Sequence, residues 1–149
     1  MKPFKQRRKY VVERSVDGAE ATLFSEKGET WFEPEQDLDT RVASVVCDED
    51  FVVRGVVHEG KQRFFVHDVL RFAGRDLREE SWPDRYRVLK NEFSWNTVVQ
   101  INRPLVVSSR EEMMEAFDMF ELFDDCTGGA VRDYDASFEE QSRRVYRGG

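Results

Sequence analysis

Short runs rich in Val and Phe, separated by turn residues, most constrain the fold of this chain. The runs that we interpret as strands span residues 9–13, 19–24, 30–32, 41–47, 51–57, 62–70, 97–101, 105–107 and 130–133. Turn residues such as Asp17-Gly18 separate these runs, and short strands joined by tight turns favour antiparallel pairing. We therefore predict two packed antiparallel sheets, with Asp17-Gly18 opening the first hairpin and residues 64–70 forming a central strand.

Two segments have the pattern of helices. Residues 82–95 follow Ser81, a suitable N-cap, and carry Pro83 early, where its missing N–H costs no hydrogen bond. A second helix is predicted from residue 108 or 109 through 124, with a serine as N-cap and two glutamates in its first turn. Together with the strands, these helices predict an α+β fold class of antiparallel sheets with flanking helices.

One side of the second predicted helix is apolar. Its members are Met113, Met114, Phe117, Phe120, Leu122 and Phe123. Apolar side chains at helical spacing usually pack into a core, so we predict that this side is buried. A Met-rich interaction groove is the alternative.

The composition is that of one globular domain over residues 1–149. Hydrophobic residues make up 40% and aromatic residues 13%, which is enough for a core and excludes a mainly disordered chain. The two cysteines lie far apart with no Cys or His at ligand spacing, which excludes a disulfide framework and a structural zinc site. We expect a cytoplasmic, intracellular protein without a membrane partner, because no run is long enough to span a bilayer and the start lacks an apolar signal core.

Charge is distributed unevenly along the chain. The formal net charge is -7, yet an N-terminal arm of about residues 1–8 is basic, and acids dominate residues 111–125. Basic arms bind polynucleotide backbones because neutralising phosphates needs no defined pocket, although a basic arm can also serve solubility alone. The residues that we predict to contact nucleic-acid phosphates or an acidic protein surface are Lys2, Lys5, Arg7, Arg8, Lys9, Arg143 and Arg144.

The candidates for a metal site are few. Asp50 ends a run of three acids that has the hard oxygen ligands preferred by Mg²⁺, although an acid-rich turn is the alternative interpretation. His58 and His67 are the only histidines and lie nine residues apart, so we expect a surface His58 and a half-buried His67 rather than a two-histidine site. The sequence contains neither G-x-x-x-x-G-K-S/T nor G-x-G-x-x-G, which removes the usual phosphate-binding loops.

Three segments carry spaced motifs in a defined order: VVERSVDGAEATLF, FFVHDVLRFAGRDL and TGGAVRDYDASF. Their motif residues are Glu13, Asp17 and Gly18 in the first, Phe64, Asp68, Leu70, Gly74, Asp76 and Leu77 in the second, and Gly128, Arg132, Asp135 and Phe138 in the third. In order and spacing these segments resemble the adenylation domain of ATP-dependent DNA ligases, over about residues 8–145.

The resemblance implies an ATP-grasp-like nucleotidyltransferase fold that uses ATP and Mg²⁺. It also implies a nucleotide site that includes Glu13, Asp17, Gly18, Phe65 and Arg132.

The chain departs from this family at the residues that carry the chemistry. Family ligases attack the nucleotide α-phosphate with a motif lysine, and that position here is Ser15. Glu20 stands where the family has an arginine, and Asp50 and Thr127 stand where it has glutamates. His67 replaces an aromatic residue, the terminal lysine pair has no match, and no OB-fold segment follows. No catalytic residue is therefore assigned, and neither ATP nor Mg²⁺ is expected as a cofactor unless ligase activity survives.

Four functional hypotheses follow. The first is a ligase-like domain that has lost adenylation and acts by binding nucleic acid or a partner protein. The second is a divergent active ligase with another nucleophile; Arg14 is excluded because guanidinium keeps its proton, and Lys9 lies six residues from Ser15, about 20 Å along a strand. The third is a structural or assembly protein of a larger complex, of viral or mobile-element origin. The fourth is an unrelated α+β binding domain with chance motif matches.

Overall fold

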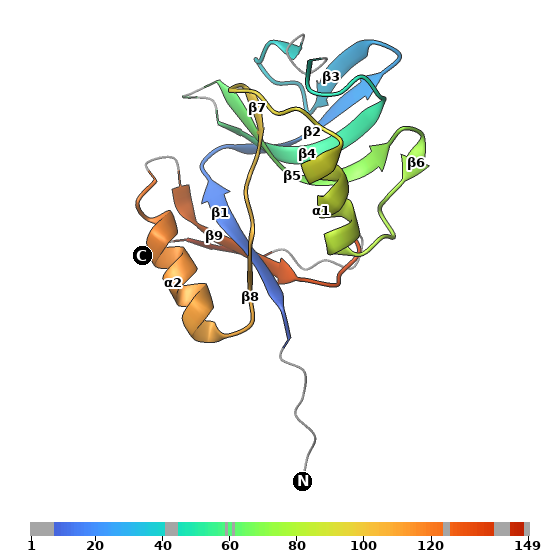
Figure 1. Cartoon of the computed structure of the whole chain (residues 1–149). Helices are drawn as coiled ribbons and strands as arrows, with labels where there is room; N and C mark the ends of the chain where they lie inside the picture. Colours follow the sequence, from blue (N-terminus) through green and yellow to red (C-terminus); the bar gives the residue numbers. More distant parts are fainter. Residues whose placement is uncertain are drawn as a thin grey trace.

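The computed structural model describes residues 8–40, 45–58, 60, 62–123, 126–138 and 144–147. Over these residues the chain forms two sheets and two helices (Figure 1). The strands are β1 (Tyr10–Val16), β2 (Ala19–Glu26), β3 (Glu29–Glu33), β4 (Phe51–His58), β5 (Arg63–Phe72), β6 (Arg75–Asp76), β7 (Val99–Ile101), β8 (Leu105–Val107), β9 (Cys126–Asp133) and β10 (Arg144–Arg147). The helices are α1 (Trp82–Asn91) and α2 (Arg110–Phe120).

The strands are arranged in two sheets that we name A and B. Sheet A has the order β10-β9-β1-β8, and sheet B has the order β3-β2-β4-β5-β6. All pairs along these two paths are antiparallel, which confirms the predicted α+β class with mainly antiparallel sheets. One pairing differs from the prediction, because β7 joins β5 in parallel, with Phe64 opposite Val99.

The predicted hairpin at Asp17-Gly18 is wrong. Strand β1 pairs with β8 and β9 in sheet A, whereas β2 pairs with β3 and β4 in sheet B. Asp17-Gly18 is therefore the point at which the chain crosses between sheets. A Cβ on Gly18 would lie 2.0 Å from the backbone oxygen of Val57, so the crossing requires a residue without a side chain.

The first true hairpin lies one strand later. Strands β2 and β3 are joined at Lys27-Gly28, and Glu26 pairs with Glu29. A strand was also predicted at 41–47. Residues 41–44 lie outside the described residues, and the prediction is wrong for Val45 to Cys47, which are not part of a strand. Residues 63–72 form a strand inside sheet B, between β4 and β6, as predicted.

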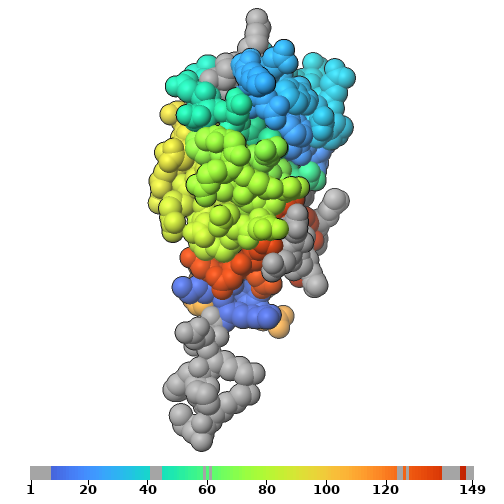
Figure 2. Space-filling model, turned by 90° about the vertical axis from the view of Figure 1, so that its right-hand side faces the viewer, coloured from blue at the N-terminus to red at the C-terminus, as the bar shows by residue number. Residues whose placement is uncertain are grey.

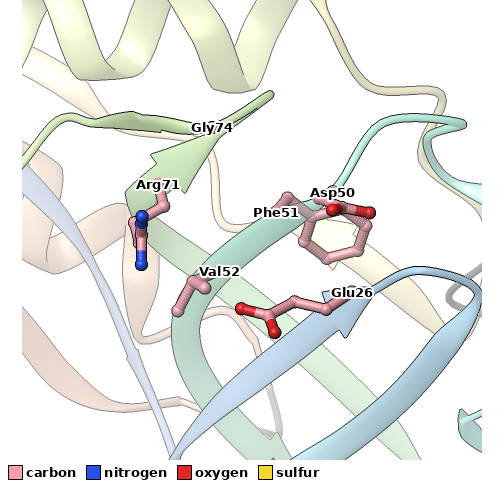
Figure 3. Close-up of a pocket in the computed structure, with 6 residues that line it drawn as sticks. All are labelled: Glu26, Asp50, Phe51, Val52, Arg71 and Gly74. Atoms are coloured by element: carbon pink, nitrogen blue, oxygen red, sulfur yellow. The ribbon is translucent and has the colours of Figure 1, made fainter.

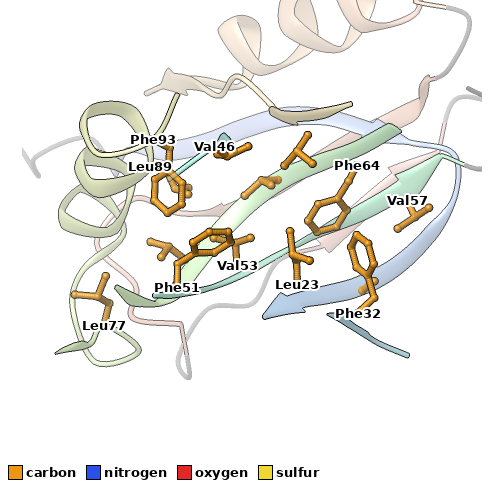
Figure 4. Packing of buried hydrophobic residues seen from close by; sticks show 14 residues of the cluster. Leu23, Phe32, Val46, Phe51, Val53, Val57, Phe64, Leu77, Leu89 and Phe93 are labelled. Atoms are coloured by element: carbon orange, nitrogen blue, oxygen red, sulfur yellow. The ribbon is translucent and has the colours of Figure 1, made fainter. Parts of the chain in front are cut away.

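The largest hydrophobic core lies on one face of sheet B, under α1 (Figure 4). Alternating strand residues face it, and α1 adds Leu89. Two edge-to-face ring pairs stiffen it, Phe32 with Phe64 at 5.0 Å and Phe51 with Phe93 at 5.2 Å between centroids. Helix α1 ends at Asn91, four residues earlier than predicted from the sequence, and the chain then folds back so that the Trp95 indole donates to the Leu89 carbonyl.

A second, smaller core lies between sheet A and α2. Val12, Val107, Ala116 and Phe120 form its buried part. Only part of the predicted apolar side of α2 takes part, since Met114 is 50% exposed, and Leu122 and Phe123 beyond the helix end are 81% and 45% exposed. The prediction that this whole side is core is therefore wrong.

Apolar contact between the two sheets is small. Its buried members are Val16, Val56 and Phe65. Figure 2 shows the green segment that contains α1 directly above the orange-red segment near residue 135, and Phe138 N–H donates to the Arg78 carbonyl across this contact. Charged side chains also join the sheets, because Arg132 of β9 pairs with Asp68 of β5.

Candidate functional site

A buried ion-pair network lies where the two sheets and α1 meet. Its centre is Asp68 of β5, whose carboxylate accepts from Arg85 of α1 through Nε at 2.8 Å and Nη2 at 3.2 Å. Arg132 of β9 donates to the same carboxylate through Nη1 at 2.9 Å. None of these three side chains is more than 2% exposed, so the charges are removed from solvent.

Arg85 ties α1 to both neighbouring parts of the chain. Beyond Asp68, its Nη1 donates to the carbonyl of Glu80 at 2.6 Å and to that of Ala136 at 2.9 Å. These hydrogen bonds to Asp68, Glu80 and Ala136 hold the guanidinium in one orientation, as its planar fork allows. Arg85 therefore acts as a structural anchor.

Arg132 connects the network to β1. Its Nη2 donates to the His67 carbonyl at 2.6 Å and lies 3.7 Å from Oε1 of Glu13. The guanidinium also stands over the Trp82 ring, 5.6 Å from its centroid. The structure thus brings together two of the predicted nucleotide-site residues, Glu13 and Arg132, as partners of each other.

The network is electrically balanced. Two carboxylates, Asp68 and Glu13, face two guanidiniums, Arg85 and Arg132. Burial by itself would raise the pKa of Asp68, but the adjacent Arg132 charge and the hydrogen bonds from Arg85 outweigh it and hold the pKa below its usual range. The site therefore presents no uncompensated positive charge of its own.

Ser15, at the position of the family's nucleophile, lies in β1 and is 8% exposed. The register of β1 against β9 shifts between Arg14 and Val16, so Ser15 stands at an irregularity of the ladder. No lysine occurs in β1 or β9. Lys9, the alternative nucleophile considered from sequence, has its Nζ over the Tyr134 ring at 5.3 Å, before the first residue of β1.

Glu20 is not an isolated negative charge. Its carboxylate lies 3.1 Å and 3.2 Å from Nε2 of His67 and 3.3 Å from Nε of Arg54. Arg54 in turn donates to the Thr22 hydroxyl at 3.2 Å. His67 is 3% exposed, so the expectation of a half-buried side chain is wrong, and its Nδ1 has no hydrogen-bond partner among the described residues.

The other predicted nucleotide-site residues are dispersed. Phe65 is 1% exposed and packs against Val16 and Val56, with the Arg14 guanidinium 5.1 Å from its ring centroid. Its ring is therefore covered rather than open for stacking. Asp17 and Gly18 lie at the crossing between the sheets, on the surface.

Asp50, the candidate metal ligand, has a structural role at the end of sheet B. Its Oδ1 accepts from the Lys27 N–H at 2.9 Å, and its carbonyl accepts from the Ala73 N–H at 2.8 Å. Figure 3 shows it near Glu26 beside a small pocket. Within the described part of the chain, no group of three or more His, Cys, Asp or Glu side chains is arranged to hold a metal ion.

The predicted basic contacts are only partly within the described chain. Lys2, Lys5, Arg7 and Arg143 lie outside it, whereas Arg8 and Lys9 are exposed. Val12 of β1 and Arg144 of β10 both pair with Val131 of β9, on opposite sides of it. The starts of β1 and β10 therefore lie at the same end of sheet A, about 10 Å apart across two strand spacings.

Sequence reasoning missed Arg85, the most deeply buried charge. A signal was present: Arg85 lies three residues after Trp82 and four before Leu89, on the apolar face of its helix. An arginine on such a face must find partners for a buried guanidinium. Those partners come from β5 and from the segment after β9, which helix periodicity does not reveal.

Solved structures of DNA ligase domains share this fold. The ligase domain of M. tuberculosis LigD superposes with a TM-score of 0.67 at 17% identity, covering 93% of this chain and 50% of that chain. A mycobacterial DNA ligase D complexed with ATP and MES gives a TM-score of 0.65 at 16% identity, covering 93% and 51%. A Lig E DNA ligase, described as binding DNA with a minimal scaffold, gives 0.64 at 13% identity, covering 96% and 64%.

These likenesses establish the ligase nucleotidyltransferase fold. The chain spans 50% of the LigD domain and 64% of the Lig E chain. No family model and no curated protein matches the sequence. Among the described residues, no helix is long and apolar enough to cross a membrane.

Proposed function

We propose that this chain is a ligase-like nucleotidyltransferase domain that forms no covalent nucleotide adduct and acts by binding nucleic acid. The observation that carries the proposal is Ser15 at the position of the nucleophilic lysine, in a strand whose partner β9 also lacks lysine. A serine hydroxyl is a weak nucleophile without an adjacent base, and its phosphoester would not replace a phosphoramide.

The residues present do not fit ATP as the resemblance implies it is held. Glu13 and Arg132 are engaged with each other and are at most 2% exposed, and Phe65 is covered. Glu20 places a carboxylate where the family has a cation, and Arg54 and His67 are its partners. The carboxylates and guanidiniums of these residues are paired with one another.

Binding to a polynucleotide is the activity that the remaining features favour. The basic arm enters β1 at the end of sheet A where β10 begins with Arg144. Arg8 and Lys9, which precede β1, are exposed, and a phosphate backbone needs several cations but no deep pocket. The net charge of -7 opposes such binding at long range, so the interaction depends on close contact and on low salt.

An adenylation assay tests the first part of the proposal. The full chain is incubated with Mg²⁺ and ATP labelled at the α-phosphate, beside an active ATP-dependent ligase as positive control. We expect no label on this chain, and none on Ser15→Lys, because Glu20 and the Glu13–Arg132 pair remain. Stoichiometric AMP on any lysine, located by mass spectrometry, would establish the divergent active ligase instead.

A binding assay tests the second part. Fluorescence anisotropy with nicked, duplex and single-stranded DNA is measured over a range of salt concentrations. We expect weak binding that disappears as salt rises. Absence of binding at low salt to all three would contradict the nucleic-acid proposal and favour the assembly-protein hypothesis.

A further inference from the structure

A groove on the outer side of sheet A is separate from the network described above. It lies between the extended segment that joins β7 to β8 and the end of α2, and has a volume of about 280 Å³. Figure 1 shows this segment running alongside β1 near α2. The lining residues are Arg14, Gln100, Ile101, Arg103, Leu105, Met119, Phe120 and Phe123.

The groove exposes apolar side chains that a monomer normally covers. Leu105 is 39% exposed, and Met119 and Phe123 are each 45% exposed. Leu122, just beyond the end of α2, is 81% exposed. Covering such side chains stabilises a complex by about 25 cal/mol per Å² of apolar surface, before the costs of association.

Two arginines, Arg14 and Arg103, line the groove. The Arg14 guanidinium lies over the rings of Phe123 at 4.5 Å and Phe65 at 5.1 Å, so its position is set before a ligand arrives. Arg103 is exposed at the opposite wall. This combination suits an anionic group placed beside apolar ones.

The neighbouring strand β8 has an edge at which the backbone of an extended peptide can pair. It ends sheet A, and among the described residues it pairs only with β1. Ile101, Arg103 and Leu105 alternate along the extended segment and all line the groove. A peptide strand added at such an edge would alternate in the same way and place every second side chain beside the groove.

The charges on α2 decide between classes of occupant. Glu115, Asp118 and Glu121 are exposed on the helix that forms one wall. A polynucleotide would bring a regular series of phosphates past these carboxylates, which is unfavourable. An apolar peptide with a single carboxylate can pair with Arg103 on the other wall and avoid most of this repulsion.

We propose that this groove binds an extended segment of a partner protein, in which an acidic residue stands between apolar residues spaced two apart. The apolar side chains cover Leu105, Met119 and Phe123, and the carboxylate pairs with Arg103. The inference is independent of the loss of adenylation, because an active ligase domain with these residues would have the same groove.

A random heptapeptide library displayed on phage is the probe, with the full chain as bait. We expect enrichment of peptides that carry Asp or Glu between apolar residues at alternate positions. Binding of the selected peptide should weaken at least tenfold in Arg103→Glu, because its carboxylate then meets a like charge. Arg110→Glu is the matched control, since it makes the same charge change at an exposed position at the start of α2, and should bind as the native chain does.

The other outcomes contradict the proposal. Enrichment of basic or uncharged peptides, no enrichment, or equal binding by Arg103→Glu would overturn it. Circular dichroism of both variants verifies that their fold is retained. Sedimentation that shows a dimer dissociated by Phe123→Ser would assign the groove to a second copy of this chain, and protection of Arg103 by single-stranded DNA would assign it to nucleic acid.

Discussion

At the scale of single residues, Asp68 is the acceptor that two buried guanidiniums share. We predict that Asp68→Asn lowers the free energy of unfolding by about 3–5 kcal/mol, because removing one partner of a buried ion pair leaves the other charges uncompensated. Urea denaturation measures the change. Asp76→Asn is the control, since the Asp76–Arg78 pair is solvent-exposed and should matter far less. Equal decreases in the two variants would show that the buried network does not hold the sheets together.

The dependence of folding stability on acid pH follows from the carboxylates of Asp68 and Asp76. The folded-state pKa of Asp68 lies below its usual range, and hydrogen bonds from Arg78 lower the pKa of Asp76 to about 2. A group with a depressed pKa contributes stability above its unfolded pKa of about 3.9, and that contribution is lost as pH falls toward the folded value. We predict that stability declines below about pH 4, and that Asp68→Asn shows a shallower decline. Urea midpoints between neutral and acid pH test this, and parallel curves would contradict it.

At the scale of secondary-structure elements, the two helices begin in different ways. The Ser109 hydroxyl accepts from the Glu112 N–H at 3.1 Å, while the Glu112 carboxylate accepts from the Ser108 N–H at 3.0 Å. The Ser81 hydroxyl instead donates to Asp84 and caps no backbone group. We predict that Ser109→Ala costs about 1 kcal/mol of stability and that Ser81→Ala costs less. Thermal unfolding of both variants compares them, and a larger decrease for Ser81→Ala would contradict the assignment.

The crossing from β1 to β2 depends on close backbone contact. A side chain at Gly18 would meet the Val57 carbonyl, whereas one at Gly28 would meet nothing within 4 Å. We predict that Gly18→Ala costs about 1–3 kcal/mol through forced backbone movement. Gly28→Ala should cost less, about 1 kcal/mol, because only its positive φ is strained. Denaturant unfolding measures both, and equal costs would mean that the crossing can relax.

At the scale of the whole molecule, the chain enters β1 at the end of sheet A where β10 begins. We predict that replacing residues 1–8 with a Gly/Ser segment of equal length weakens DNA binding and flattens the dependence of log K on log salt. The slope should fall by about 0.9 for each duplex phosphate that the arm no longer neutralises. Anisotropy titrations at several salt concentrations measure the slope. Arg75→Gln, an exposed change on β6, is the control. An unchanged slope would remove the arm from the binding surface.

Much of the local structure was predictable from sequence. The Val- and Phe-rich runs became strands at 51–58, 63–72 and 105–107, and a serine capped the second helix, because alternation and capping depend on residues close together in the chain. The ligase-like motif order also indicated the α+β fold. The pairing of Glu13 with Arg132 was not predictable, since each was expected to face a nucleotide.

The sequence by itself determined most of the strand and helix segments, the absence of lysine at position 15 and the uneven charge. Tertiary structure alone decided that β1 leaves β2 to pair with β8 and β9, that Arg85 is buried against Asp68, and that Phe123 stays at the surface. The physical reason is that a turn signal specifies a change of direction but not the strand that receives the chain. Strand pairing and side-chain burial depend on which faces of segments far apart in the sequence pack against each other. A short stretch of sequence contains no information about those distant faces.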